Sequence, residues 1–226
     1  MRVFVTGIRG VIGSHVMAAL VSQGHEVSGC DLRDGCDVRE YGPVEARMLA
    51  EKPEAVVHTA GIAHPSPAYS WQDYWDTNVA GTQNVAQAAV AAGVRRLVYT
   101  SSTTYYGAER GFPLGNERLA VLSPNAVQRY MHAVLPEMGP WPRASVYYMM
   151  SKIAAETVLA AFGLSERLQV RIFRLCPCSP EGLPYEWGLR LKLNRAAVVL
   201  AAAALAEADG FYQVMPLCEP DVGMVG

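Results

Sequence analysis

The 226-residue chain lacks an apolar segment long enough to cross a bilayer. Its longest nearly pure apolar run, 196–206, is about half of the roughly 20 residues that a membrane-spanning helix needs, and a buried helix explains it better. Residues 1–7 resemble a strand entering a glycine turn and not a signal peptide with a cleavage site. We therefore expect a cytoplasmic protein without a membrane partner.

Excess charge and paired cysteines are also missing. Nineteen Lys and Arg residues against twenty-one Asp and Glu residues give a net charge of -2, and neither sign forms long runs, which excludes an extended nucleic-acid footprint. The five cysteines are an odd number without zinc-finger spacing. Cys176 and Cys178 have no partner ligands nearby in the sequence, so we expect reduced thiols, no disulfide framework and no metal.

The residues that are present predict one large α/β domain. Hydrophobic residues make up 51% of the chain and charged residues 18%, enough for a substantial core. Short β-branched runs alternate with helical patterns: strands are predicted at 2–6, 26–30, 55–58, 96–100 and 169–173, and helices near 11–23, 43–51, 72–92, 148–162 and 196–206. This alternation is typical of a Rossmann-type, doubly wound parallel sheet with helices on both faces.

Glycine and proline indicate where these elements end. Gly24 and Gly93 follow predicted helices at positions that suit a left-handed cap. Asp37 and Val38 are expected in a short third strand. The segment 108–145 contains five prolines and no clear period, so it is predicted to be a long irregular excursion.

A glycine-rich turn follows the first strand. Gly7, Gly10 and Gly13 form a GxxGxxG pattern that leads into a helix. Such a turn lets a diphosphate approach the backbone closely, and the helix N-terminus offers free N–H groups. Asp31 ends the second strand, where a carboxylate accepts hydrogen bonds from adenosine ribose hydroxyls and favours NAD. Arg33 complicates this choice, since it either pairs with the 2'-phosphate of NADP or is a solvated surface charge; we favour the latter.

Tyr148 and Lys152 are the candidate reactive pair. Among eleven tyrosines, only Tyr148 has a lysine four residues later, on the same face of a helix. A tyrosine with an ordinary pKa of about 10 is a poor base unless a nearby positive charge stabilises its phenolate. Residues 98–102 end another strand, which places Ser102 at the carboxyl edge of the sheet. There its hydroxyl would hold a substrate oxygen while Tyr148 moves a proton.

In combination these motifs resemble the extended short-chain dehydrogenase/reductase family, the NAD-dependent epimerase/dehydratase group. The resemblance covers about residues 1–175. The matching segments are 6–13 (TGxxGxxG), 58–61 (an HxAG-like fourth strand), 78–82 (an NxxGT helix start), 101–107 (SSxxxYG) and 148–152 (YxxSK).

The resemblance implies a site and an assembly. It makes Ser102, Tyr148 and Lys152 the catalytic triad, with Lys152 also holding the nicotinamide ribose, and it implies a homodimer through the helices that start near Asn78 and Tyr148. The expected cofactor-binding residues are Gly7, Arg9, Gly10, Val11, Ile12, Gly13, Asp31, Leu32, Arg33, Asp37, Val38, Thr59, Ala60, Gly61, Asn78, Thr100, Tyr148, Lys152 and Cys176. The expected substrate-binding residues are His64, Ser102, Thr103, Thr104 and Tyr148.

The C-terminal part departs from the family. About fifty residues follow Arg174, and Pro177 stands where the family has an asparagine that contacts substrate phosphates. We expect a Rossmann domain at 1–175 with the excursion inserted, and a shortened substrate-binding part at 176–226 on the same domain. The excursion is a possible lid, and four of its residues either line the pocket or lie on a plain surface, the latter favoured: Tyr130, His132, Trp141 and Arg143.

Three functions are consistent with this sequence. The leading hypothesis is an NAD-dependent oxidoreductase or epimerase that transfers hydride at a carbinol carbon of a sugar-like substrate. Dehydration ranks lower, because Thr103 and Thr104 stand where a dehydratase has an acidic pair. Oxidation of a free sugar acid, as in the compact uronate dehydrogenases, is the first alternative. An NAD-binding regulatory protein without catalysis is the second.

Overall fold

A computed structural model describes residues 1–106, 143–165, 167–180, 189–207, 210–217 and 219–220. The elements of its first half are β1 (Arg2–Thr6), α1 (Val11–Ser22), β2 (Glu26–Cys30), η1 (Leu32–Asp34), α2 (Tyr41–Glu51), β3 (Ala55–His58), α3 (Trp71–Tyr74), η2 (Trp75–Ala80), α4 (Gly81–Ala91), β4 (Arg96–Ser102) and η3 (Thr103–Tyr106). The second half contains α6 (Arg143–Leu164), β5 (Gln169–Leu175), β6 (Cys178–Ser179), β7 (Leu189–Lys192), α7 (Leu193–Leu205), β8 (Tyr212–Leu217) and β9 (Glu219–Pro220).

The central sheet has six strands in the order β2-β1-β3-β4-β5-β8. Every neighbouring pair is parallel, with Thr6 opposite His58 and Ser102 opposite Leu175 at the carboxyl ends. The predicted doubly wound parallel sheet is therefore confirmed. A small second sheet joins β6, β7 and β9.

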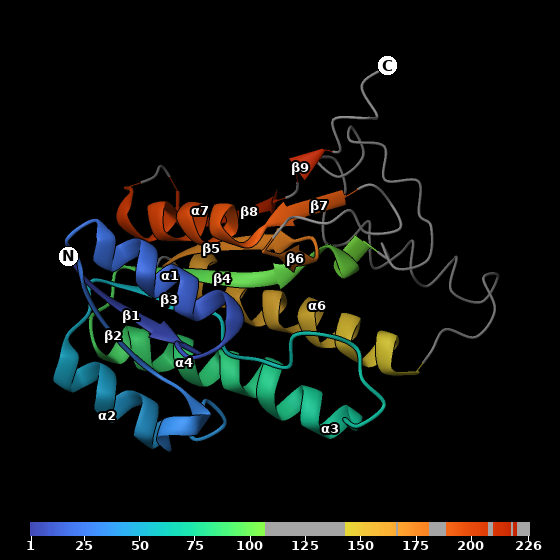
Figure 1. Ribbon diagram of the computed structural model, residues 1–226. Coiled ribbons are helices and arrows are strands. Elements are labelled where there is room, and N and C mark those ends of the chain that lie inside the picture. Colours follow the sequence, from blue (N-terminus) through green and yellow to red (C-terminus); the bar gives the residue numbers. More distant parts are fainter. Residues whose placement is uncertain (107–142, 166, 181–188, 208–209, 218, 221–226) are drawn as a thin grey trace.

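Helices cover both faces of the large sheet (Figure 1). On one face, α1 and α7 pack over β1, β3 and β4 around buried Val16, Leu20 and Leu200. On the other, α2, α4 and α6 cover Phe4 and Leu97. Strands β3 and β4 are buried along their whole length, which explains why their residues form continuous apolar runs instead of alternating with polar ones. Residues after 175 add α7 and β8 to these same layers.

Four details differ from the sequence-based expectation. Residues 37–38 form no third strand: they lie in a turn region between η1 and α2, because Asp37 binds the Arg39 amide and side chain instead of a sheet edge. The motif 58–61 therefore follows the third strand and not a fourth. Asn78 starts no helix, since it lies in the π-helical stretch that joins α3 to α4. The excursion ends earlier than 145, because α6 begins at Arg143.

Other expectations concern helix ends and the excursion. Gly24 and Gly93 have φ values of 79° and 72°, as predicted for left-handed caps. Tyr130, His132 and Trp141 lie outside the described residues. Arg143 is exposed at the start of α6. Among the helices that the structure describes, none is both long and apolar enough to span a membrane.

Candidate active site

The glycine turn closes tightly between β1 and α1. Gly7 has φ 66°, and its carbonyl accepts the Gly10 N–H at 2.8 Å. A Cβ atom at Gly13 would lie 2.2 Å from the Gly7 carbonyl oxygen, so no side chain fits there. Gly10 caps α1 without a side-chain hydrogen bond. The first-turn amides of an α-helix have no acceptor within the helix, so those of α1 fit the diphosphate of a dinucleotide.

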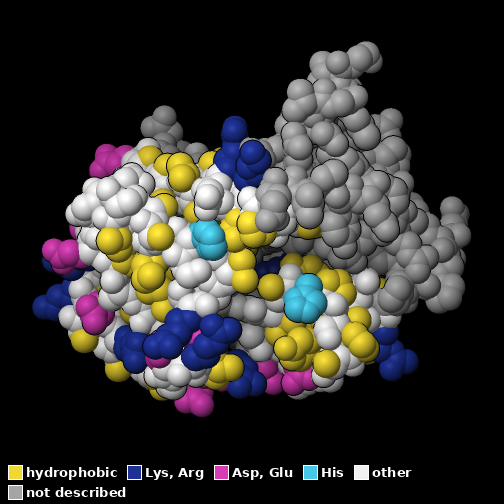
Figure 2. All heavy atoms as spheres, in the orientation of Figure 1, with side chains coloured by type: hydrophobic (Ala, Val, Ile, Leu, Met, Phe, Trp, Pro, Cys, Tyr) yellow, Lys and Arg dark blue, Asp and Glu magenta, His cyan; other side chains and the backbone are white. Residues whose placement is uncertain are grey.

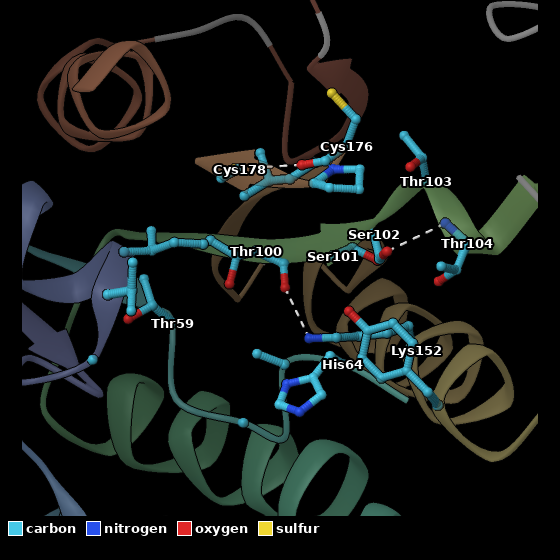
Figure 3. Close-up of a pocket in the computed structure, with 18 of the residues that line it drawn as sticks. Thr59, His64, Thr100, Ser101, Ser102, Thr103, Thr104, Lys152, Cys176 and Cys178 are labelled. Carbon is cyan, nitrogen blue, oxygen red and sulfur yellow. Dashed lines mark hydrogen bonds between the residues drawn. The ribbon is translucent and has the colours of Figure 1, made fainter. Parts of the chain in front are cut away.

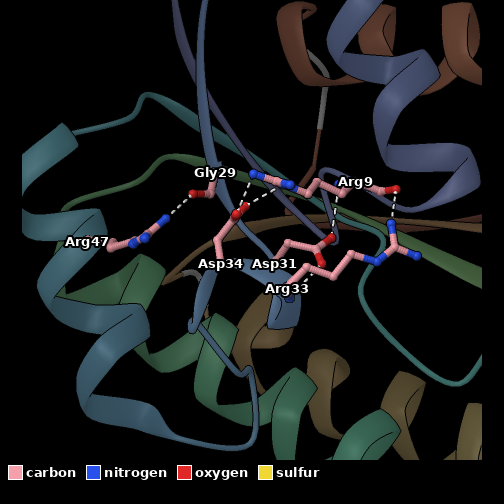
Figure 4. Close-up of polar contacts among 6 residues, drawn as sticks. All are labelled: Arg9, Gly29, Asp31, Arg33, Asp34 and Arg47. Carbon is pink, nitrogen blue, oxygen red and sulfur yellow. Dashed lines mark hydrogen bonds and ion pairs between the residues drawn. The ribbon is translucent and has the colours of Figure 1, made fainter.

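Asp31 lies beside this turn at the end of β2 (Figure 4). One carboxylate oxygen accepts the Arg9 backbone N–H at 2.9 Å, and the other accepts the Arg33 backbone N–H at 3.1 Å. Each oxygen keeps a second acceptor site, so the carboxylate still has room for two ribose hydroxyls. Leu32 is 65% exposed, whereas Val38 is buried against Gly81, where a Cβ atom would lie 2.9 Å from a Val38 methyl carbon.

A cavity of about 520 Å³ runs from the glycine turn to α6 (Figure 3). The carboxyl ends of β3, β4 and β5 form its floor, as expected for a ligand site in an open α/β sheet. Its described lining consists of Gly10, Val11, Ile12, Gly13, Thr59, Gly61, Ala63, His64, Pro65, Thr100, Ser101, Ser102, Thr103, Thr104, Tyr148, Lys152, Leu175, Cys176, Pro177 and Cys178.

Lys152 is almost fully buried in the cavity wall. Its ammonium donates to the Thr100 carbonyl at 3.1 Å and to the Tyr99 hydroxyl at 3.3 Å, and lies 6.0 Å from the centre of the Tyr148 ring. Burial lowers the pKa of Lys152 from 10.5 to about 8, and the Glu156 carboxylate limits the fall. The ammonium form of Lys152 therefore still predominates at pH 7, although it loses its proton more easily than an exposed lysine would.

Tyr148 and Ser102 line the same cavity from opposite elements. Tyr148 is 6% exposed on α6, and its ring meets Tyr74 edge to face at 6.2 Å. The Tyr74 hydroxyl donates to the His64 carbonyl and accepts the Ser66 N–H, so it holds the loop that carries His64. Ser102 Oγ accepts the Thr104 N–H at 3.2 Å.

A buried ion pair supports this wall from behind. Glu156 lies one turn after Lys152 on α6 and pairs with Arg174 of β5, with side chains only 3% and 2% exposed. The Ser101 hydroxyl also donates to Glu156 at 2.6 Å. The pair thus joins α6 to the ends of β4 and β5, directly beside Ser102 and Leu175.

His58 ties β1, β3 and α4 together below the cavity. Because the Thr82 hydroxyl donates to the Asn78 carbonyl at 2.6 Å, it accepts from His58 Nε2 at 3.0 Å. His58 Nδ1 then accepts the Thr6 hydroxyl at 2.6 Å. Burial, and then the charge of Lys152, lower the pKa of His58 to about 3. The ring is neutral, with its proton on Nε2.

Asn78 joins the cavity loop to α6. Its side chain accepts the Ile62 N–H at 2.8 Å and donates to the Ile62 carbonyl and to Ser151 Oγ, which in turn donates to the Tyr148 carbonyl. A Cβ atom at Gly61 would lie 2.8 Å from its Oδ1. Asn78 therefore positions the wall of the site and does not line the cavity.

The cavity brings together the three predicted catalytic residues, ten of the nineteen expected cofactor residues and every expected substrate residue. Some expected residues lie outside its lining: Gly7, Arg9, Asp31, Leu32, Arg33, Asp37, Val38, Ala60 and Asn78. Six lining residues were missed: Ala63, Pro65, Ser101, Leu175, Pro177 and Cys178. For the last four, their position at or just after the ends of β4 and β5 was the available signal, whereas Ala63 and Pro65 lie in the loop after β3. No group of three His, Cys, Asp or Glu side chains within the described ranges is arranged to hold a metal.

The sequence profile of the NAD dependent epimerase/dehydratase family matches residues 3–182. The chain belongs to this family. The predicted family and the predicted cofactor, NAD, are therefore confirmed. The prediction of an enzyme agrees with the same membership.

Curated relatives and solved structures that resemble this chain include several UDP-glucose 4-epimerases. A UDP-glucose 4-epimerase of Klebsiella pneumoniae is 34% identical over 137 residues, which are 50% of this chain and 97% of the relative. Other curated matches span only about two fifths of the relatives' own length, 41% and 40% in two cases. Among solved structures, the Thermus thermophilus UDP-glucose 4-epimerase complex with NAD has a TM-score of 0.69 at 22% identity, covering 96% of this chain and 78% of that one.

The Stenotrophomonas maltophila UDP-glucose 4-epimerase, solved with bound NAD and formylated UDP-arabinopyranose, has a TM-score of 0.72 at 20% identity and covers 98% of this chain and 79% of that one. At this identity the two structural matches establish the fold.

Proposed function

We propose that this protein is an NAD-dependent oxidoreductase or epimerase that transfers hydride at a carbinol carbon of a sugar or sugar derivative. One observation carries the proposal: the Lys152 ammonium is held in the wall of a single cavity that has Tyr148 beside it and the glycine turn at its other end. Ser102 supplies a hydroxyl from the facing strand.

Tyr148 acts as the proton-transferring group. Its phenolate is stabilised by the ammonium of Lys152, whose charge acts at short range in a buried site. Ser102 holds the substrate oxygen and orients the carbinol carbon. The Thr100 carbonyl and the Tyr99 hydroxyl keep Lys152 in place. The ammonium is therefore already ordered before the reaction, and little conformational entropy is lost when it acts.

The residues of the turn fit a dinucleotide, with the α1 amides on the diphosphate and Asp31 on the adenosine ribose. When bound, the nicotinamide supplies the acceptor and donor of hydride. Lys152 would also contact the nicotinamide ribose. Thr59, Ala60, Gly61, Thr100 and Cys176 would flank the cofactor where the strands end.

The substrate end of the cavity favours a polyhydroxy compound. Ser102, Thr103 and Thr104 place three hydroxyl groups there, and His64 lies near the opening. The relatives named as UDP-glucose 4-epimerases support a nucleotide sugar. Pro177, which has no N–H to donate, lines the cavity just after β5 and favours the alternative, a free sugar or sugar acid.

Tyr148→Phe tests the proposal. We expect it to abolish turnover while the NAD Kd, measured by calorimetry, changes less than about threefold, because the phenol oxygen matters only for proton transfer. Tyr147→Phe is the matched control, since Tyr147 is the neighbouring tyrosine and packs on Trp71. Nucleotide sugars, free aldoses and uronates are offered in parallel. Accumulating NADH identifies a dehydrogenase, and product without net NADH an epimerase.

Retained turnover in Tyr148→Phe would refute the role of this residue. Thermal stabilisation by NAD with no turnover of any offered sugar would instead support a regulatory NAD-binding protein.

We also propose a homodimer through α6 and the α3–α4 helix. Exposed Met150 and Trp75 support this, at 38% and 41% exposure, and light scattering tests it. The division into a domain at 1–175 and a substrate part at 176–226, and a cytoplasmic location, remain parts of the same proposal.

A further inference from the structure

Arginine side chains surround Asp31, the proposed ribose ligand (Figure 4). Arg33 lies two residues after it, and its guanidinium donates to the Arg9 carbonyl at 2.9 Å. The Arg9 guanidinium itself pairs with Asp34. Arg33 therefore reaches back over the glycine turn, to the backbone of the residue whose N–H binds Asp31. This places a guanidinium beside the position where the 2'-hydroxyl of an adenosine would lie.

Arg9, Arg33 and Arg47 all lie near this position (Figure 4). Among the described residues, Arg33 forms no ion pair with a carboxylate, and Arg47 donates to the Gly29 carbonyl at 2.9 Å. Figure 2 shows Lys and Arg side chains gathered on the face where the β1–α1 and β2–α2 connections lie.

Asp31 by itself would repel the 2'-phosphate of NADP, but hydrogen-bond donors already offset part of its negative charge. Both of its oxygens accept backbone N–H groups. Arg33 is exposed, and its guanidinium is held by a hydrogen bond to a neutral carbonyl. A phosphate would offer this guanidinium a full negative charge and oxygens that match its planar fork, neither of which the neutral carbonyl provides.

We infer that the cofactor site also accepts NADP, with Arg33 binding the 2'-phosphate and Arg9 contributing after release from its exposed pair with Asp34. Such exposed pairs are worth at most about 1 kcal/mol, so release is easy. This inference rests on the proposed dinucleotide site and extends it from one cofactor to two. It reverses the sequence-based preference for a solvated surface charge, because the Arg33 guanidinium is held against the glycine turn, and it assigns Arg33 a role in specificity that NAD binding alone does not require.

Binding measurements with the whole chain test the inference without any substrate. NAD, NADP, 5'-ADP and 2',5'-ADP are titrated by calorimetry. We expect NADP to bind within about tenfold of NAD, and its affinity to fall more steeply with salt. Arg33→Ala should weaken NADP and 2',5'-ADP about tenfold or more, which is the scale of a lost charged hydrogen bond. NAD and 5'-ADP should change less than about threefold. Arg33→Lys should retain part of the preference.

Arg95→Ala is the control, because it removes the same charge from an exposed arginine just before β4, at the amino end of the strands and away from the glycine turn. Equal losses in Arg95→Ala and Arg33→Ala would overturn the inference, as would equal weakening of NAD and NADP by Arg33→Ala. A wild-type chain that binds NAD but not NADP would overturn this inference alone. A chain that binds neither would overturn the proposed function with it.

Discussion

The Lys152 ammonium lies 3.3 Å from the hydroxyl of Tyr99, a residue of β4 that is almost fully buried and stacked on His58. Burial, and then the charge of Glu156, raise the pKa of Tyr99. Its hydroxyl therefore stays protonated and neutral beside the ammonium. Tyr99 touches neither substrate nor cofactor in the proposed site, so it is a positioning residue for Lys152.

Tyr99→Phe tests this relationship. We expect kcat to fall about three- to tenfold with little change in KM, because Lys152 loses one of two hydrogen bonds and about 1 kcal/mol of positioning. The pH–rate profile should shift as well, since the ammonium loses an acceptor. An unchanged pH profile combined with a lower melting temperature would indicate a purely structural role.

Lys152→Met is expected to stabilise the fold while it abolishes turnover. Burying the ammonium lowers its pKa to about 8 from 10.5, so the charged form is less stable in the folded chain than in the unfolded one. At pH 7 the substitution should raise the free energy of unfolding by about 1 to 3 kcal/mol. Between pH 8 and 10.5 the unfolded chain binds more protons at this lysine, so wild-type stability rises and the difference narrows. Thermal denaturation across this range measures it.

Glu156→Gln should be among the most destabilising single changes, because it removes the carboxylate that pairs with the buried Arg174 guanidinium. We expect a loss of about 3 to 5 kcal/mol, read from urea denaturation. Glu54→Gln breaks the exposed pair with Arg95 and should cost less than about 1 kcal/mol. Similar losses in the two variants would show that the buried pair is solvated.

Gly13→Ala should abolish dinucleotide binding, because its Cβ atom would lie 2.2 Å from the Gly7 carbonyl oxygen and push the turn open. Gly42→Ala in α2 is the matched control, since a Cβ atom there meets nothing within 4 Å. It should leave NAD affinity unchanged and stabilise the helix by up to about 1 kcal/mol. Calorimetry with NAD separates the two, and normal binding by Gly13→Ala would show that the turn is not the cradle.

Acid should destabilise the chain through His58. Its pKa is lowered to about 3 from 6.5 by burial and by Lys152. Below pH 6.5 the unfolded chain takes up a proton that the folded chain refuses, so stability present above pH 6.5 is lost as the pH falls toward 3. We expect a loss of about 3 to 5 kcal/mol from this group over that range. His58→Gln, less stable at pH 7, should show a shallower pH dependence between about 6.5 and 4.

Much of the fold and site follows from local sequence. The predicted strands at 2–6, 26–30 and 55–58 match the observed bounds of β1, β2 and β3, because apolar runs between glycine or polar breaks leave few alternatives. Gly7 and Gly13 could be recognised from the GxxGxxG spacing, because a turn whose conformation and packing exclude side chains requires glycine at these positions. Tyr148 and Lys152 were recognisable because a four-residue spacing on a helix brings them together whatever the rest of the chain does.

The amino-acid sequence alone therefore determined the α/β class, the glycine turn and the spacing of Tyr148 and Lys152 on one helix, all of which depend on neighbours within about one helical turn or one strand. Only the tertiary structure decided which residues meet across elements. It placed Tyr99 under Lys152, Glu156 against Arg174, Asn78 between a loop and α6, and Arg33 over the backbone of Arg9. These contacts join residues 16 to 73 positions apart. No local pattern encodes them, because they arise from the stacking order of the strands and the burial it imposes.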